Sequence, residues 1–165
     1  MLACHSRFQP QEFAMARKTH TTGRPWEAMG GYARAVRVGD LVETSLCSPA
    51  SDDGTILFPG DVYRQTQISL QVIGKSLRAL SMDFKDVIKT RIYLADATRW
   101  TEAARAHKEV FDRIRPALGF IYMSGFFHPD IAVEVECTAY RPGRAKAAPA
   151  KKKTAARPKL HRRSR

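Results

Sequence analysis

The chain has 165 residues, enough for one domain with a substantial hydrophobic core, and its charge is unevenly placed. Of its 28 Lys and Arg residues, ten lie between Arg144 and Arg165, a segment without any Asp or Glu. The remaining 18 basic residues and all 16 acidic residues lie in residues 1–143. The net charge of +12 therefore belongs mainly to the C-terminal segment, and a basic folded surface is not implied.

The cysteines argue against a disulfide framework and against a structural zinc site. Cys4, Cys47 and Cys137 are odd in number and show no CxxC spacing. No apolar run reaches the roughly 20 residues of a membrane helix, and the N-terminus lacks the apolar core of a signal peptide. The expected location is cytoplasmic. Because neither a metal-ligand cluster nor a glycine-rich phosphate loop is present, we expect no cofactor.

The first half of the chain predicts an irregular lead-in, a hairpin and a loop. Residues 1–26 are polar and aperiodic. The β-prone runs Ala33–Val38 and Leu41–Cys47 flank Gly39-Asp40, which is a hairpin signal. Ser48–Gly60 is rich in Ser, Asp, Gly and Pro and is expected to be a loop.

Two amphipathic helices and three strands are expected in the second half. Asp61 can cap the first helix, which carries an apolar stripe and, at Gly74, a position that indicates close packing. The stripe consists of Leu70, Ile73, Leu77 and Leu80. The later elements are a strand over Val87–Leu94, a helix over Arg99–Ile114 that ends before Pro116, and strands over Leu118–Met123 and Ile131–Tyr140.

This order predicts an α+β fold with two helices on one face of a mixed β-sheet. The other face would keep apolar residues such as Leu46, Phe120 and Tyr122. A sheet face of that kind is usually covered by another subunit. We therefore expect an oligomer.

The last strand carries the candidate catalytic residue. Glu134 and Glu136 are two positions apart, so both side chains point the same way. A carboxylate works as a general acid or base when a dry pocket raises its pKa, and the alternative is an exposed or ion-paired strand face. His107, on the apolar stripe of the second helix, is expected to be a packed core residue.

Several segments, in order, resemble the RidA/YjgF family of reactive-intermediate deaminases, often called L-PSP endoribonucleases. They are GGYARAVRVGDLVETS, DVIKTRIYLAD, HKEVFDRIRPA and VEVECTAY, within Glu27–Tyr140. The resemblance implies a chorismate-mutase-like fold over residues 27–143, a homotrimer, and ligand clefts between subunits.

The resemblance also implies roles for individual residues. Glu134 corresponds to a glutamate that positions water for attack on an imine, and Tyr32 and Ser45 correspond to pocket residues. Leu118 stands where RidA-type members carry an arginine that holds the substrate carboxylate, and Phe120 would narrow and dry the cleft. Leucine offers no charge-assisted hydrogen bonds, so an unmodified 2-iminoacid is not the expected preferred substrate.

The sequence and the resemblance leave three possible functions. The first is hydrolytic deamination of enamine or imine intermediates with a non-standard substrate, in clefts between subunits. The second is a non-catalytic trimer that binds a small metabolite and is tethered to nucleic acid by its basic tail. The third is ribonuclease activity, which we rank lowest because no acid–base constellation for phosphodiester cleavage is visible.

The C-terminal segment 144–165 suggests a further partner. Its Lys, Ala, Pro and Arg composition predicts disorder and non-specific binding to nucleic acid through the phosphates, with a merely solvated tail as the alternative. At the other end of the chain, Met1 and Met15 are both possible translation starts.

Overall fold

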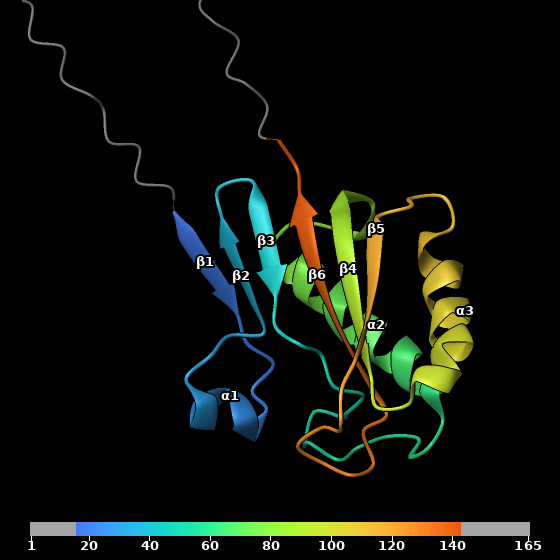
Figure 1. Ribbon diagram of the computed structural model, residues 1–165. Helices are drawn as coiled ribbons and strands as arrows, with labels where there is room; N and C mark the ends of the chain where they lie inside the picture. The colour runs from blue at the N-terminus through green and yellow to red at the C-terminus, as the bar shows by residue number, and fades with distance from the viewer. Residues whose placement is uncertain (1–15, 143–165) are drawn as a thin grey trace, which may run out of the picture.

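The computed structural model describes residues 16–142, which form one six-stranded sheet with the two long helices on one face (Figure 1). The strand order is β1-β2-β3-β6-β4-β5, in which only β4 and β5 are parallel neighbours. The predicted α+β class with a mixed sheet is confirmed. The elements are β1 (Arg17–His20), α1 (Pro25–Gly30), β2 (Ala35–Val38), β3 (Leu41–Thr44), α2 (Val62–Ala79), η1 (Phe84–Asp86), β4 (Val87–Leu94), η2 (Ala97–Arg99), α3 (Trp100–Phe111), β5 (Ala117–Tyr122) and β6 (Val133–Tyr140).

Residues close in sequence determine the hairpin between β2 and β3 and the start of helix α2. β2 and β3 pair antiparallel with Val38 opposite Leu41, and Gly39 between them has φ 57°, a value that favours glycine. The Asp61 side chain accepts a hydrogen bond from the Arg64 backbone amide at 2.9 Å, which caps α2. Both predicted features are confirmed.

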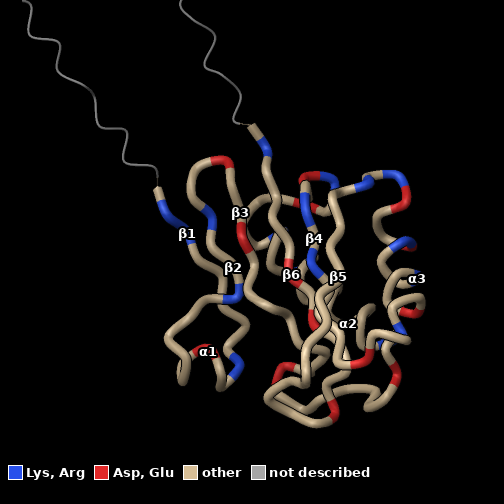
Figure 2. The backbone as a smooth tube through the Cα atoms, viewed as in Figure 1, with Lys and Arg blue, Asp and Glu red and all other residues tan. Residues whose placement is uncertain are grey.

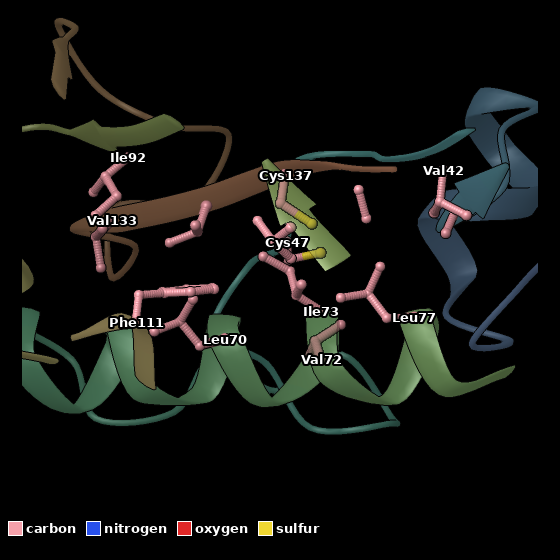
Figure 3. Packing of buried hydrophobic residues seen from close by; sticks show 14 of the residues in the cluster. Val42, Cys47, Leu70, Val72, Ile73, Leu77, Ile92, Phe111, Val133 and Cys137 are labelled. Carbon is pink, nitrogen blue, oxygen red and sulfur yellow. The ribbon is translucent and has the colours of Figure 1, made fainter. Parts of the chain in front are cut away.

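The core lies between α2, α3 and the covered face of the sheet. Leu70, Ile73 and Leu77 point from α2 toward the sheet, where they meet side chains of β6 such as Val133 and Cys137 (Figure 3). Such burial of apolar side chains is the main stabilising contribution, about 25 cal/mol per Å². The core therefore fixes the position of β6, the strand that carries Glu134.

Three local predictions differ from the structure. Residues 17–20, expected to be irregular, form strand β1 beside β2. Alternation along Val87–Leu94 predicts Ile88 on the same face as Ile92 and Leu94, but a register shift between Val87 and Lys89 leaves Ile88 exposed. Phe120 and Tyr122, expected on the open face, are paired with Ile92 and Leu94, which belong to the core side of the sheet.

The open face of the sheet is polar at its centre. The Arg91 guanidinium lies 2.6 Å from a carboxylate oxygen of Glu136, and the Tyr93 hydroxyl donates to that same oxygen at 3.2 Å. Thr138 donates to Glu43 at 3.0 Å. Figure 2 shows basic residues on β4 and acidic residues on its neighbour β6. The open face is thus less apolar than the sequence suggested.

Some expectations fall on residues outside the described range. These are the state of residues 1–15, including Cys4 and the Met15 start, and the disorder expected for 144–165. Within residues 16–142, no helix has both the length and the apolar content that crossing a membrane requires.

Candidate active site

Glu134 is a buried carboxylate on the open side of the sheet. Only 5% of the residue is exposed, and the Ser48 hydroxyl donates a hydrogen bond to its Oε1. Burial raises the pKa of the Glu134 carboxyl, although the Ser48 hydrogen bond and the charge of Arg34 act in the opposite direction. A carboxyl group of this kind can hold or release a proton closer to neutral pH than an exposed glutamate can.

A cavity of about 510 Å³ opens in front of Glu134. Tyr32, Ser45 and Ser48 supply hydroxyl groups to its lining. The apolar part consists of Trp26, Leu46 and Phe127, of which the two aromatic rings pack edge to face with centroids 4.9 Å apart. The volume suits a small organic molecule, and the lining combines apolar walls with a few polar groups.

Arg34 lies behind this cavity and orders its polar side. It is 1% exposed, and its Nε donates to Glu27 at 3.0 Å. Its two terminal nitrogens donate to the Ser45 hydroxyl at 3.0 Å, the Leu46 carbonyl oxygen at 2.6 Å and the Tyr32 hydroxyl at 3.1 Å. Arg34 therefore holds Tyr32 and Ser45 in place, and it is not itself a wall of the cavity.

Glu27 completes this buried ion pair from the short helix α1. Burial opposes ionisation of Glu27, but hydrogen bonds from Thr22 and Arg34 outweigh that effect and lower its pKa. Its carboxylate accepts from the Thr22 hydroxyl at 2.6 Å and from the Thr22 amide at 2.8 Å. The pair therefore ties α1, which carries Trp26, to the start of β2.

The structure places the remaining sequence-predicted residues elsewhere. Leu118 and Phe120 pair with Thr90 and Ile92, so they lie on the helix side of the sheet, across from Glu134. Phe120 packs edge to face on Trp100 with centroids 5.8 Å apart, and Leu118 is 40% exposed. Within one chain, these two residues do not share a cavity with Glu134.

Two candidates from the sequence have structural partners. Glu136 points the same way as Glu134 but is engaged by Arg91 and Tyr93. His107 lies 2.9 Å from the Thr90 hydroxyl, and burial lowers its pKa to about 4, as suits the packed core residue expected there. Neither residue lines the cavity in front of Glu134.

Sequence reasoning missed four lining residues: Trp26, Leu46, Ser48 and Phe127. Trp26 follows Pro25, and Phe127 lies in a Phe-Phe pair before His128-Pro129, so aromatic residues outside the predicted strands and long helices were the available signal. Ser48 gave no signal because its role depends on the pairing of Cys47 with Val135, which brings the loop beside β6. In the part of the chain that the structure describes, no group of three or more His, Cys, Asp or Glu is placed to hold a metal ion.

Comparison with family models gives one match, described as Endoribonuclease L-PSP, over residues 22–141. Among curated proteins, an uncharacterised protein of Streptomyces coelicolor is 35% identical over 121 residues, 73% of this chain and 89% of that protein. The human 2-iminobutanoate/2-iminopropanoate deaminase is 25% identical over 126 residues, which cover 76% of this chain and 91% of the enzyme.

Solved structures show the same fold. Rv2704 from Mycobacterium tuberculosis, described as a member of the YjgF/YER057c/UK114 family, has a TM-score of 0.69 and 32% identity, covering 76% of this chain and all of that one. TdcF from E. coli, solved with bound serine, has a TM-score of 0.65 and 26% identity, covering 74% of this chain and 97% of that one.

Proposed function

Because the chain belongs to the RidA/YjgF family, whose relatives include 2-iminobutanoate/2-iminopropanoate deaminases, we propose that it hydrolyses an imine or enamine in the Glu134 cavity. The observation that carries the proposal is the buried Glu134 carboxyl beside three hydroxyl groups, in a cavity with apolar walls. A purely apolar cavity would have favoured a binding module instead. The polar groups around Glu134 favour catalysis.

The chemistry needs one group that moves protons. Water attacks the imine carbon while Glu134 accepts a proton from the water and passes it to the imine nitrogen, which gives a neutral carbinolamine. Glu134 then accepts the proton of the new hydroxyl group and donates it to the nitrogen as the C–N bond breaks, so the products are a carbonyl compound and ammonia and Glu134 is again a carboxylate. A carboxyl with a raised pKa suits both steps because it is a stronger base than an ordinary glutamate and still a usable acid.

The substrate should lack a free carboxylate. None of the Lys and Arg residues that the structure describes lines the cavity, and Arg34 is buried with its guanidinium engaged by Glu27, Ser45 and Tyr32. A carboxylate placed in the cavity would lie near Glu134 without a cation to pair it, at a cost on the order of 2–5 kcal/mol. Trp26 and Phe127 favour an apolar or aromatic substituent.

Leu118 and Phe120 can contribute to the substrate cleft only from a second subunit. They lie on the other side of the sheet from Glu134, so within one chain they cannot contact the same ligand. We propose a homotrimer in which β5 of one subunit faces the Glu134 cavity of the next. Leu118, 40% exposed, would then supply an apolar wall to the cleft.

Ribonuclease activity has weaker support. Cleavage of a phosphodiester calls for an acid and a base placed on either side of the phosphate. The cavity contains one carboxyl group, and none of the described histidines, His20, His107 and His128, lines it.

The proposal is tested by measuring hydrolysis of imines released in situ by oxidases. We expect the neutral imine from benzylamine to be hydrolysed faster than spontaneously, and 2-iminobutanoate to be a poor substrate. Glu134→Gln should lower the rate by about 10²-fold or more. Glu136→Gln is the matched control, because Glu136 lies outside the cavity. Equal rates for Glu134→Gln and the unmodified chain would remove Glu134 from the mechanism.

A further inference from the structure

A second cavity, of about 420 Å³, lies between the end of β1, the loop after Ser48 and helix α2. It shares no lining residue with the Glu134 cavity. Its volume is within the range of small-molecule sites. The proposed deaminase chemistry gives it no role.

Arg24, which lines this cavity, is a buried cation without an ion pair. It is 2% exposed, and its terminal nitrogens donate to the carbonyl oxygens of Ser48, at 3.4 Å, and Ala50. Among residues 16–142, its Nε has no hydrogen-bond partner and no carboxylate lies within 4.0 Å of the guanidinium. A buried charge is costly unless it is paired, so this arrangement is suited to an anion.

The rest of the lining divides into charged or polar groups and an apolar wall. Lys75, from the exposed side of α2, adds a second positive charge, and His20 and Gln71 add polar groups. Among residues 16–142, the exposed Asp52 is the only acidic residue in the lining. The apolar wall consists of Leu57, Ile68 and Val72.

Burial and the charge of Arg34 lower the pKa of Arg24 and outweigh the opposite effects of Cys47, Asp52 and Glu27. Asp52 acts in the other direction but is exposed and forms no ion pair with Arg24 within 4.0 Å. An anionic ligand would offset this imbalance.

We propose that this cavity binds a small organic anion, with a carboxylate or phosphate head group beside Arg24 and Lys75 and a short apolar body against Leu57, Ile68 and Val72. Charge-assisted hydrogen bonds to a guanidinium are about twice as strong as neutral ones, so the head group supplies most of the specificity. The site is independent of the Glu134 chemistry, and its test does not rely on activity.

Ser48 contacts residues of both cavities, so it can report when a ligand binds beside Arg24. Arg24 donates to the Ser48 carbonyl oxygen, while the Ser48 hydroxyl donates to Glu134. A ligand that shifts Arg24 therefore perturbs the Ser48 backbone. The amide resonance of Ser48 is a reporter in addition to those of the lining residues.

The experiment is a titration of the ¹⁵N-labelled full chain with hexanoate, inorganic phosphate and 1-hexanol. We expect saturable shifts at Thr22, Ser51 and Gln71 with hexanoate, and much weaker ones with the neutral alcohol. If inorganic phosphate shifts the same amides, a phosphate head group is sufficient for binding. If only hexanoate shifts them, the ligand needs a carboxylate and an apolar body. At about ten times its dissociation constant, the binding ligand should raise Tm by about 3–8 °C.

Variants test whether the anion binds in the cavity or only through general attraction to the charged surface. Lys75→Gln should weaken binding about 2–5-fold, and Gln71→Glu, which places a negative charge at an exposed position, should weaken it at least as much. Arg24→Gln should weaken binding by tenfold or more, provided that its spectrum shows a folded chain. Lys85→Gln, exposed and outside the cavity, is the matched control and should bind normally.

Three results would overturn the proposal. One is the absence of saturable shifts with both anions. Another is equal binding by 1-hexanol, which would make the site merely apolar. The third is wild-type affinity in both Lys75→Gln and Gln71→Glu, which keep the buried contacts of Arg24 and therefore do not depend on how Arg24→Gln folds.

Discussion

At the scale of single residues, Leu118 is the position that should decide between substrates. In the proposed trimer it faces the cavity of a neighbouring subunit, where an arginine would pair a substrate carboxylate. Leu118→Arg should therefore raise the rate with 2-iminobutanoate at least about tenfold and leave the rate with a neutral imine unchanged or lower. Because Leu118 is 40% exposed, the longer side chain can be accommodated without a core rearrangement.

The control for this substitution is Leu118→Gln, which is polar but uncharged. It should not increase the rate with 2-iminobutanoate. If both variants leave both rates unchanged, Leu118 is remote from the cleft and the proposed subunit arrangement is wrong. Rates are measured as loss of the imine after subtraction of spontaneous hydrolysis.

Glu134 should also make the stability of the protein depend on pH. Burial raises its folded pKa above the usual 4.5, so between these two values the folded chain binds more protons than the unfolded chain. The contribution of Glu134 to stability is therefore lost as pH rises through that window. Glu134→Gln cannot ionise, so its Tm relative to the unmodified chain should be higher at pH 8 than at pH 4.

The comparison is made by thermal unfolding at several pH values. Glu136→Gln serves as control, because it breaks the ion pair with Arg91 and should show no such gain at high pH. A difference in Tm between Glu134→Gln and the unmodified chain that does not change with pH would mean that burial imposes no penalty on the Glu134 charge. The proposed general acid–base role would then lose its physical basis.

At the scale of elements, the crossing of α2 with η1 depends on Gly74. A Cβ at this position would lie 2.8 Å from Cζ of Phe84, whose ring packs edge to face on Phe111 and cannot move away freely. Overpacking costs about 1–3 kcal/mol, while the helix gains about 1 kcal/mol from alanine. Gly74→Ala should therefore lower the free energy of unfolding by about 1 kcal/mol.

Urea denaturation measures this change, and a second background tests its cause. In Phe84→Leu, where the ring is gone, Gly74→Ala should be neutral or stabilising. A loss of the same size in both backgrounds would show that the cost does not come from contact with Phe84.

The elements predictable from sequence are those specified by nearby residues. The hairpin at Gly39-Asp40 and the cap at Asp61 depend on neighbours within a few positions, and both were predicted. Strand β1 was missed because Arg17–His20 has no apolar alternation and is held only by pairing with β2. The faces of Phe120 and Tyr122 depend on their register with β4, which no local pattern reveals.

The candidate site divides in the same way. Tyr32, Ser45 and Glu134 were identified from the family resemblance, and the structure brings all three to one cavity. Trp26, on the short helix α1, and Ser48 and Phe127, in loops, reach the cavity only because distant contacts place these segments, such as the pairing of Cys47 with Val135. Arg34, which no local pattern singles out, orders the pocket from behind through hydrogen bonds to Ser45 and Tyr32.

At the scale of the whole molecule, the open sheet face together with the edge strand β5 should form the interface of a homotrimer. Light scattering of the full chain should give three times the chain mass of 18.5 kDa. Ile121 lies on the open face opposite Tyr93, and Ile121→Asp should lower the mass toward one chain, since a charge buried without a partner is costly. Ala97→Asp, exposed in η2, should remain trimeric. A monomeric unmodified chain would remove the proposed cleft.

If the protein binds nucleic acid, the basic segment 144–165 should be responsible for that binding. It carries ten Lys and Arg residues and no acidic residue, whereas residues 1–143 carry 18 basic and 16 acidic ones. Neutralising phosphates releases counterions, so retention on DNA or heparin should fall steeply with salt and show little sequence preference. Three segments on one trimer would strengthen binding through effective concentration.

Two variants test this assignment. Deletion of 144–165 should abolish retention, and so should a chain of full length in which the ten Lys and Arg residues of the segment are replaced by Gln. The second variant separates charge from length. Retention that survives either change, or that does not respond to salt, would place the nucleic-acid surface on the folded domain. That outcome would also strengthen the ribonuclease hypothesis, because nucleic acid would then be bound by the domain that contains the cavity and not by the basic segment.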